Sequence, residues 1–151
     1  MANVYFQSSV QLVFAVEHRK ALIQPVFQQR LHSYIGGLLI NKKHKPLAIN
    51  SVKDHIHIFF GMYPCDLPAL VGEIKSNSSK WINKSKFTQC HFQWQNGYGF
   101  FTYCNRHRSN VIQYIDNQQA HHQIETFREE YIGILEEAGI EYDEKYLFEF
   151  F

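Results

Sequence analysis

Apolar residues are arranged along this chain in two patterns. Short runs rich in β-branched and aromatic residues predict strands, and apolar positions three or four apart predict helices. The predicted strands are Val10–Val16, Leu47–Val52, His55–Phe60 and Phe92–Tyr103, the last with a bulge or bend at Gly97 and Gly99. The predicted helices run from Pro25 to Leu39, from about Asp66 to Ile82, from Val111 to about His122 and from Ile124 to Ala138.

This order of elements indicates a fold. Strand, helix, strand, strand, helix and strand predict an α+β ferredoxin-like sandwich, in which helices cover one face of an antiparallel sheet. Further helices follow at the C-terminal end. At 151 residues the chain is expected to form one domain, residues 1–151. Within it we expect a helix at about 110–122 and an acidic helix and tail at 124–151.

A histidine pair interrupts the third predicted strand. His55 and His57 stand two apart in an otherwise apolar run that ends at Gly61. Since alternate strand residues share a face, both imidazoles should point the same way, which makes a half-site for a divalent cation. Neutral imidazole and amide ligands would suit Mn, Mg, Co or Zn. Asp54 could orient one imidazole, although its neighbouring position puts it on the opposite face.

The other half of the predicted site lies downstream. Tyr114 and Gln118 are four apart, so they share one face of a helix, and His121 and His122 follow one turn later. A phenol with a pKa near 10 is a weak nucleophile unless a nearby cation polarises its target. The combination indicates phosphodiester chemistry with Tyr114 as nucleophile. His121 or His122 could substitute as a metal ligand, but we expect both to be supporting groups or phosphate contacts. A plain core tyrosine is the alternative.

Charge separates along the chain. Residues 1–124 contain thirteen Lys and Arg against five Asp and Glu, whereas residues 125–151 contain two against nine. A basic body suits a polyanionic partner, and exposed aromatic residues beside basic ones can stack on unpaired bases. The candidates for DNA contact are Lys80, Trp81, Trp94, Tyr98, Arg106 and Arg108. Among them, Trp94 and the turn at Tyr98 are expected to be exposed.

Several classes are disfavoured by what the sequence lacks. No apolar run approaches 18 residues, so no membrane span is expected. Three cysteines without a CxxC pair argue against a disulfide framework or a zinc ribbon. Phe59 stands where a histidine-triad hydrolase would carry its third histidine. The paired motifs of two-histidine phosphodiesterases and of zinc deaminases are missing as well.

Four segments together resemble a known family, the HUH single-tyrosine transposases of small bacterial insertion sequences. They cover about residues 8–148 in the family's order: Asp54–His57 with its apolar tail, Ser78–Ile82, Trp94–Phe100 and Tyr114–Gln118 leading to His121 and His122. Rolling-circle initiators and relaxases share the histidine pair and the tyrosine but are usually larger.

The resemblance implies a mechanism and partners. His55 and His57 would be metal ligands and Gln118 the third, for Mg or Mn. Tyr114 would attack single-stranded DNA and leave a 5′-phosphotyrosine and a free 3′-OH. Relatives act as homodimers on hairpins near element ends, in the cytoplasm of bacteria or archaea. Residues 105–110 would form the hinge that lets the tyrosine helix serve either protomer.

Two other interpretations stay open. One is a non-catalytic ferredoxin-like protein that stacks single-stranded bases on its sheet, as RNA-recognition domains do. The other is a domesticated relative that keeps the chemistry but acts on the host's own repeats.

Overall fold

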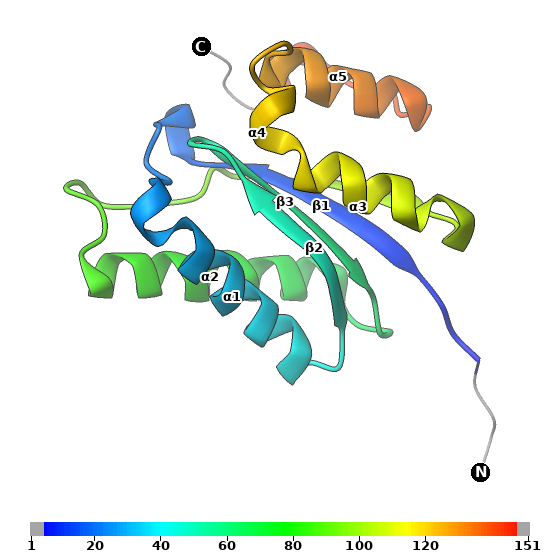
Figure 1. The fold of residues 1–151 in the computed structure, drawn as a ribbon, viewed down its shortest axis with the longest axis horizontal. Coiled ribbons are helices and arrows are strands. Elements are labelled where there is room, and N and C mark those ends of the chain that lie inside the picture. Colours follow the sequence, from blue (N-terminus) through cyan, green and yellow to red (C-terminus); the bar gives the residue numbers. More distant parts are fainter. Residues whose placement is uncertain (1–4, 148–151) are drawn as a thin grey trace.

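The computed structural model describes residues 5–147, and its fold is the predicted α+β sandwich (Figure 1). In chain order the main elements are β1 (Ser9–Ala15), α1 (Pro25–Asn41), β2 (Lys45–Ser51), β3 (His55–Gly61), α2 (Leu67–Ser85), β4 (Gly99–Tyr103), α3 (Arg108–Asp116), α4 (Gln118–His121) and α5 (Phe127–Glu137). Short 3-10 turns lie at Glu17–Arg19, Asn105–His107 and Glu144–Tyr146. Residues 148–151 of the predicted tail lie outside the described residues.

The four strands form one sheet in the order β2-β3-β1-β4, with every neighbouring pair antiparallel. β1 is central, and its Leu12 lies opposite Ile58 on β3 and Phe100 on β4. The chain thus places β3 between two partners, which satisfies its backbone hydrogen bonds on both sides. This pairing gives the histidine pair a rigid support.

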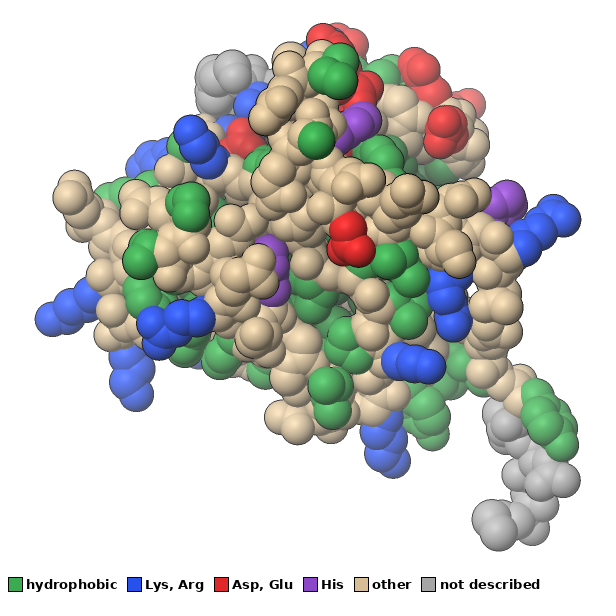
Figure 2. Space-filling model, in the orientation of Figure 1, with side chains coloured by type: hydrophobic (Ala, Val, Ile, Leu, Met, Phe, Trp, Pro, Cys, Tyr) green, Lys and Arg blue, Asp and Glu red, His purple; other side chains and the backbone are tan. Residues whose placement is uncertain are grey.

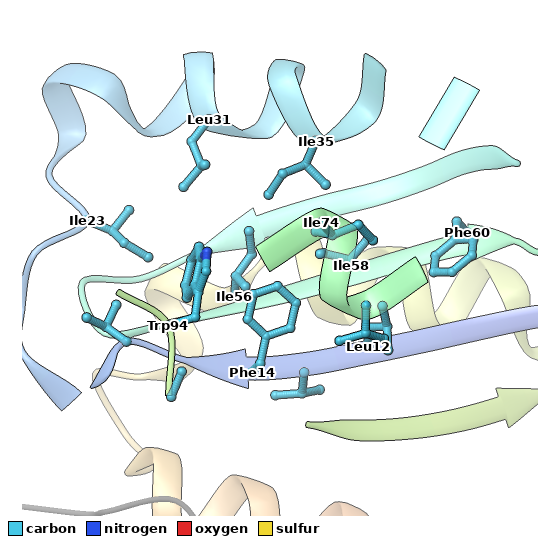
Figure 3. Close-up of a cluster of buried hydrophobic side chains, with 14 of the residues drawn as sticks. Leu12, Phe14, Ile23, Leu31, Ile35, Ile56, Ile58, Phe60, Ile74 and Trp94 are labelled. Atoms are coloured by element: carbon cyan, nitrogen blue, oxygen red, sulfur yellow. The ribbon is translucent and has the colours of Figure 1, made fainter. Parts of the chain in front are cut away.

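One face of the sheet packs on α1 and α2 and forms the main hydrophobic core (Figure 3). Leu12 and Phe14 of β1 and Ile56, Ile58 and Phe60 of β3 all point to this face and are fully buried. Because side chains alternate along a strand, the residues between them on β3 must point to the other face.

The second face of the sheet is covered by α3, α4 and α5 (Figure 1). A small apolar cluster fastens α3 to it, in which Val111 and Ile115 pack on Phe59 and Ala48. No helix among residues 5–147 combines the length and the apolar character that a membrane crossing would need.

The predicted strand at residues 92–103 is too long. Only Gly99–Tyr103 pairs as β4, and Trp94 makes an isolated bridge to Val16. Gly97 has φ +93° and redirects the chain, while the Lys75 ammonium donates hydrogen bonds to the carbonyls of Gln95 and Gly97. Left-handed backbone at a glycine ends the regular pairing here, instead of making a bulge within one strand.

Two helix bounds predicted near the C-terminus also need correction. The expected helix from Val111 to His122 is broken at Asn117 (φ −96°, ψ 17°), which separates α3 from α4. The segment proposed as a hinge, residues 105–110, forms a 3-10 turn that continues into the first turn of α3, and its role as a hinge stays a prediction. The last helix begins later than predicted, at a cap where the Thr126 hydroxyl accepts a hydrogen bond from the Glu129 amide.

Candidate active site

The histidine pair projects from β3 toward the second face of the sheet, as the alternation predicts. His55 and His57 are fully buried, and their ring centroids lie 5.3 Å apart. Both Nε2 atoms approach the same carboxylate oxygen, Glu130 Oε1, at 3.4 Å from His55 and 3.0 Å from His57. The two rings therefore point at one common position.

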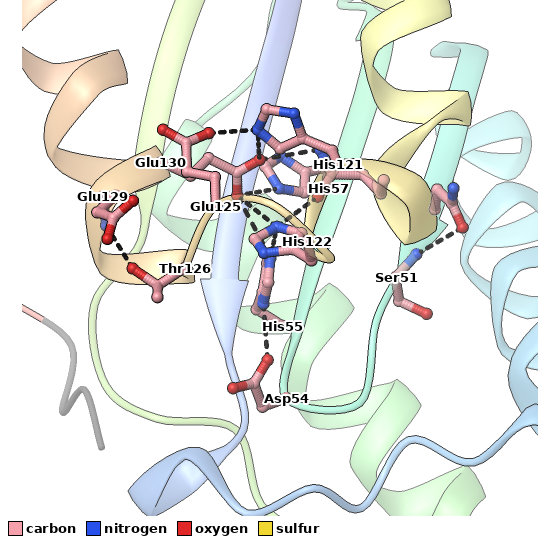
Figure 4. Close-up of polar contacts among 12 residues, drawn as sticks. Ser51, Asp54, His55, His57, His121, His122, Glu125, Thr126, Glu129 and Glu130 are labelled. Atoms are coloured by element: carbon pink, nitrogen blue, oxygen red, sulfur yellow. Dashed lines mark hydrogen bonds and ion pairs between the residues drawn. The ribbon is translucent and has the colours of Figure 1, made fainter.

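Glu130 is the centre of this cluster (Figure 4). It comes from α5, and its side chain is only 1% exposed. His122 Nε2 lies 3.1 Å from the same Oε1 and 3.2 Å from His55 Nε2. Four side chains, those of His55, His57, His122 and Glu130, thus offer donor atoms that all lie within 4.8 Å of one another.

The tyrosine reaches the same carboxylate from its other side. The Tyr114 hydroxyl donates a short hydrogen bond to Glu130 Oε2, and Gln118 Nε2 donates to the same oxygen at 2.9 Å. Gln118 Oε1 lies 3.0 Å from His122 Nε2. Although Asn117 breaks the helix between them, Tyr114 and Gln118 still converge as predicted. One carboxylate therefore connects the strand histidines with the phenol and the amide.

A second layer of contacts fixes the histidine rings. Asp54 Oδ1 lies 2.8 Å from His55 Nδ1, and Asp54 is itself paired with Arg19 at 3.0 Å. Phe127 of α5 stacks on His55 with ring centroids 3.7 Å apart. Adjacent residues in a strand point to opposite faces, but Asp54 lies in the turn before β3, so its carboxylate can still reach the His55 ring. An acceptor on Nδ1 keeps the proton there and leaves Nε2 facing the cluster.

His57 has a comparable support on β1. Gln11 Nε2 lies 2.8 Å from His57 Nδ1, and the Tyr103 hydroxyl donates to Gln11 Oε1 at 2.9 Å. Gln11 is 1% exposed and occupies the face of the central strand that carries the site. These contacts orient the His57 ring toward Glu130.

The site's electrostatics follow from burial and from these contacts. Burial alone would raise the pKa of Glu130, but the facing His57, His122 and His55 hold that pKa well below its usual range. Burial, followed by the Glu130 charge and hydrogen bond, raises the pKa of Tyr114 far above its ordinary value. Burial lowers the pKa of His57. The phenol is therefore protonated at neutral pH and donates its proton toward a carboxylate.

His121 borders the tyrosine on the solvent side. Its Nε2 lies 3.4 Å from the Tyr114 hydroxyl and is paired with Glu125. Next to it is a cleft of about 850 Å³, whose lining includes Tyr114, His121, Glu125 and Glu130. The phenol is half-buried and borders this open space, so it is not enclosed in packed hydrocarbon.

The tyrosine helix is anchored to β2 by a pair of amides. Asn50 Nδ2 donates to the Ile115 carbonyl at 2.8 Å and to Gln119 Oε1 at 2.9 Å, and Gln119 Nε2 donates back to Asn50 Oδ1 at 2.8 Å. Gln119 Nε2 also donates to the Ser51 carbonyl. These bonds satisfy the backbone where α3 ends and α4 begins.

Replacing Asn50 with alanine is expected to loosen this junction. The change removes the amide that binds the Ile115 carbonyl and Gln119, and we expect a loss of about 1–3 kcal/mol in unfolding free energy. Amide hydrogen exchange should speed up in residues 111–121 more than in α1. An exchange rate in that segment equal to wild type would contradict the anchoring role. The exposed Asn96, replaced by alanine, is the matched control.

The predicted DNA contacts lie apart from this cluster. The expectation that Trp94 is exposed is wrong: it is 4% exposed, contacts Phe14 edge-on and donates its indole N–H to Ser78 Oγ at 2.8 Å. Its segment folds over the end of the main core, which removes the indole from solvent. Lys80 is exposed on α2, and Trp81 beside it is half-buried and stacked on Tyr34.

The remaining three candidates differ in exposure. Tyr98 is half-buried and packs against the main core, so it is less open than the sequence suggests. Arg106 is exposed in the turn before α3. Arg108 is half-buried, and its Nη2 donates to Ser9 Oγ at 3.1 Å. Acidic side chains gather mainly where α5 lies, at the top of Figure 2.

Sequence reasoning missed two central residues, Glu130 and Gln11. Glu130 is one of nine acids after residue 124, which we interpreted as a solvated acidic helix. Yet it lies beside Tyr131 on the face of α5 that Phe127 and Leu135 bury. A carboxylate on an apolar helix face, and a glutamine within an apolar strand, are signals that could have identified both.

The fold and the site together define a class of protein: a ferredoxin-like sheet that presents a strand histidine pair to a helix-borne tyrosine. The family described as IS200-like transposases matches residues 4–118, and the chain belongs to this family. It is therefore a DNA transposase. No curated protein matches the chain as a relative.

Two solved structures share the fold. A candidate transposase from Deinococcus radiodurans R1 superposes with a TM-score of 0.61 at 18% identity, over 78% of this chain and 95% of that one. A REP-associated tyrosine transposase bound to a REP hairpin superposes with a TM-score of 0.59 at 15% identity, over 81% of this chain and 73% of that one.

Proposed function

We propose that this transposase cuts and rejoins single-stranded DNA with Tyr114 as its nucleophile. The observation that carries the proposal is the convergence of the Tyr114 hydroxyl and the His55–His57 pair on one buried carboxylate, within a single chain. A tyrosine with only a packing role would not direct its hydroxyl to the group that the strand histidines face.

In the proposed cleavage, the Tyr114 oxygen forms a bond to phosphorus while the bond from phosphorus to the 3′ oxygen breaks. The phenolic proton is released to solvent as this bond forms, and Glu130 Oε2, which accepts the hydroxyl's hydrogen bond, holds the phenol in position. The products are a 5′-phosphotyrosine and a DNA strand whose 3′ oxygen takes a proton from solvent. Attack by a 3′-OH on the phosphotyrosine reverses these steps and joins a strand, with no nucleotide cofactor.

A divalent metal, Mg or Mn, fits the donor chemistry of this site. The donors are the imidazoles of His55 and His57, and Gln118 is the proposed third ligand; its amide lies against His122 and Glu130. A bound cation would polarise the scissile phosphate and stabilise the charge on the leaving oxygen.

Three further residues have proposed supporting roles. Asp54 and His122 support the histidine pair, and His121 is placed to contact a phosphate beside Tyr114.

We infer that the substrate is a hairpin-forming single strand at an element's end. The solved REP-associated relative holds a REP hairpin, and the excess of Lys and Arg before residue 125 suits a polyanion. Lys80, Trp81, Tyr98, Arg106 and Arg108 remain the proposed DNA contacts. A homodimer and a cytoplasmic location stay predictions from the family resemblance.

The test uses labelled oligonucleotides from the flanks of the protein's own gene, incubated with the protein and Mn²⁺. A denaturing gel should show a covalent protein–DNA adduct with single strands and none with the matching duplex. EDTA should remove the adduct. A well-folded sample that forms no adduct with any flank would instead favour the non-catalytic binding protein.

A further inference from the structure

Helix α5 contributes to the site although it lies after the residues that match the family. The family match ends at residue 118, and α5 spans Phe127–Glu137. Phe127, Tyr131 and Leu135 pack α5 on the rest of the chain, and Glu130 enters the histidine cluster from the same face. The carboxylate at the site therefore comes from a helix outside the segment that matches the family.

We propose that Glu130 and His122 are ligands of the divalent metal, together with His55 and His57. This inference rests on the proposed metal-dependent function and extends its ligand set beyond the histidine pair and Gln118. In Figure 4 these four side chains converge from β3, from the C-terminal end of α4 and from α5.

The distances among the donor atoms fit a shared ion. From Glu130 Oε1, the Nε2 atoms of His57, His122 and His55 lie at 3.0, 3.1 and 3.4 Å, and the His55–His122 separation is 3.2 Å. Ligands bound at about 2.1 Å are about 3.0 Å apart along an octahedral edge and about 3.4 Å along a tetrahedral edge. These four of the six separations lie within that range, and all six are within 4.8 Å, so a bound ion would need only small shifts of the remaining pairs.

The chemistry of the donors favours the same conclusion. Imidazoles and an amide are neutral, whereas Mg²⁺ and Mn²⁺ prefer carboxylate oxygen. Glu130 would supply the negative charge that the histidine pair and Gln118 lack.

A purely structural role explains Glu130 less well. Three apolar residues already dock α5, and a buried charge contributes little net stability because its desolvation offsets its contacts. Its Oε1 instead faces three imidazole nitrogens that all point inward.

The proposal makes α5 a metal-dependent element. The ion would link α5 to β3 through Glu130 and to α4 through His122. Metal should therefore slow amide exchange in residues 127–137, in addition to any effect on β3. Because Glu130 Oε2 also holds the Tyr114 hydroxyl, the same link would set the distance between the cation and the nucleophile.

The test measures Mn²⁺ binding to the full-length protein by calorimetry, without DNA. We expect E130A and H122A each to weaken Mn²⁺ binding by at least about tenfold. E130Q should weaken it similarly, although the glutamine side chain has almost the same shape as glutamate. The control is E129Q, which removes the same charge from the exposed neighbouring residue. Circular dichroism in EDTA verifies folding. The visible spectrum of the Co²⁺ form should change in E130Q and not in E129Q.

The outcomes separate the two proposals. If wild type binds no Mn²⁺ or Co²⁺, the metal-dependent function and this ligand set fail together. If H57A abolishes binding but E130A, E130Q and H122A bind as wild type does, the function stands and the extended ligand set is overturned. Tighter binding by E130A would also overturn it, because Glu130 would then compete with the metal.

Discussion

Replacing Tyr114 with phenylalanine is expected to lower adduct formation by at least about 10³-fold, because the phenyl ring lacks the oxygen that would attack phosphorus. The variant keeps the ring and loses only the oxygen, so binding of a hairpin oligonucleotide should remain within about threefold of wild type. A denaturing gel measures the adduct, and a fluorescence titration measures binding. A non-catalytic binding protein would show no adduct before or after the change.

The matched control for this variant is Tyr34→Phe. Tyr34 is also half-buried in a helix, but it stacks on Trp81, away from the histidine cluster. It should form the adduct at the wild-type rate. If Y34F and Y114F lost activity equally, the effect would be one of folding and Tyr114 would have no special role.

Replacing His57 with alanine is expected to affect both activity and stability. His57 is fully buried and contacts Glu130 at 3.0 Å, so its loss removes a proposed metal ligand and leaves a buried carboxylate with one partner fewer. We expect adduct formation to fall at least about 100-fold. Unfolding free energy in EDTA should fall by about 3 kcal/mol.

Urea unfolding at pH 7 measures the loss of unfolding free energy, and calorimetry with Mn²⁺ measures the loss of metal binding. The control is His91→Ala, an exposed histidine in the segment before β4, which should change neither. An H57A protein that formed the adduct at the wild-type rate would remove the histidine pair from the mechanism.

The parts of this structure that sequence could predict follow from short-range periodicity. The pattern of β3 has period two, so the shared face of His55 and His57 followed from their spacing and from the apolar residues between them. Tyr114 and Gln118 were placed together by a helical spacing of four. That prediction survived the break at Asn117 because both residues still reach Glu130.

The parts that sequence could not predict depend on how distant segments pack. Glu130 enters the site only because α5 docks on the second face of the sheet, and no local pattern fixes that docking. Trp94 looked exposed in a segment rich in glycine and aromatic residues, yet the segment folds back so that the indole reaches Ser78. In both cases tertiary contact decides the environment of the side chain.

Peptide mapping of the adduct identifies the atom that becomes covalently bonded to DNA, which we propose is the Tyr114 oxygen. The protein is trapped with a single-stranded flank and Mn²⁺, treated with nuclease and protease, and sequenced by tandem mass spectrometry. We expect a nucleotide attached through its 5′ phosphate to Tyr114. A nucleotide on any other residue, or attachment through a 3′ phosphate, would contradict it.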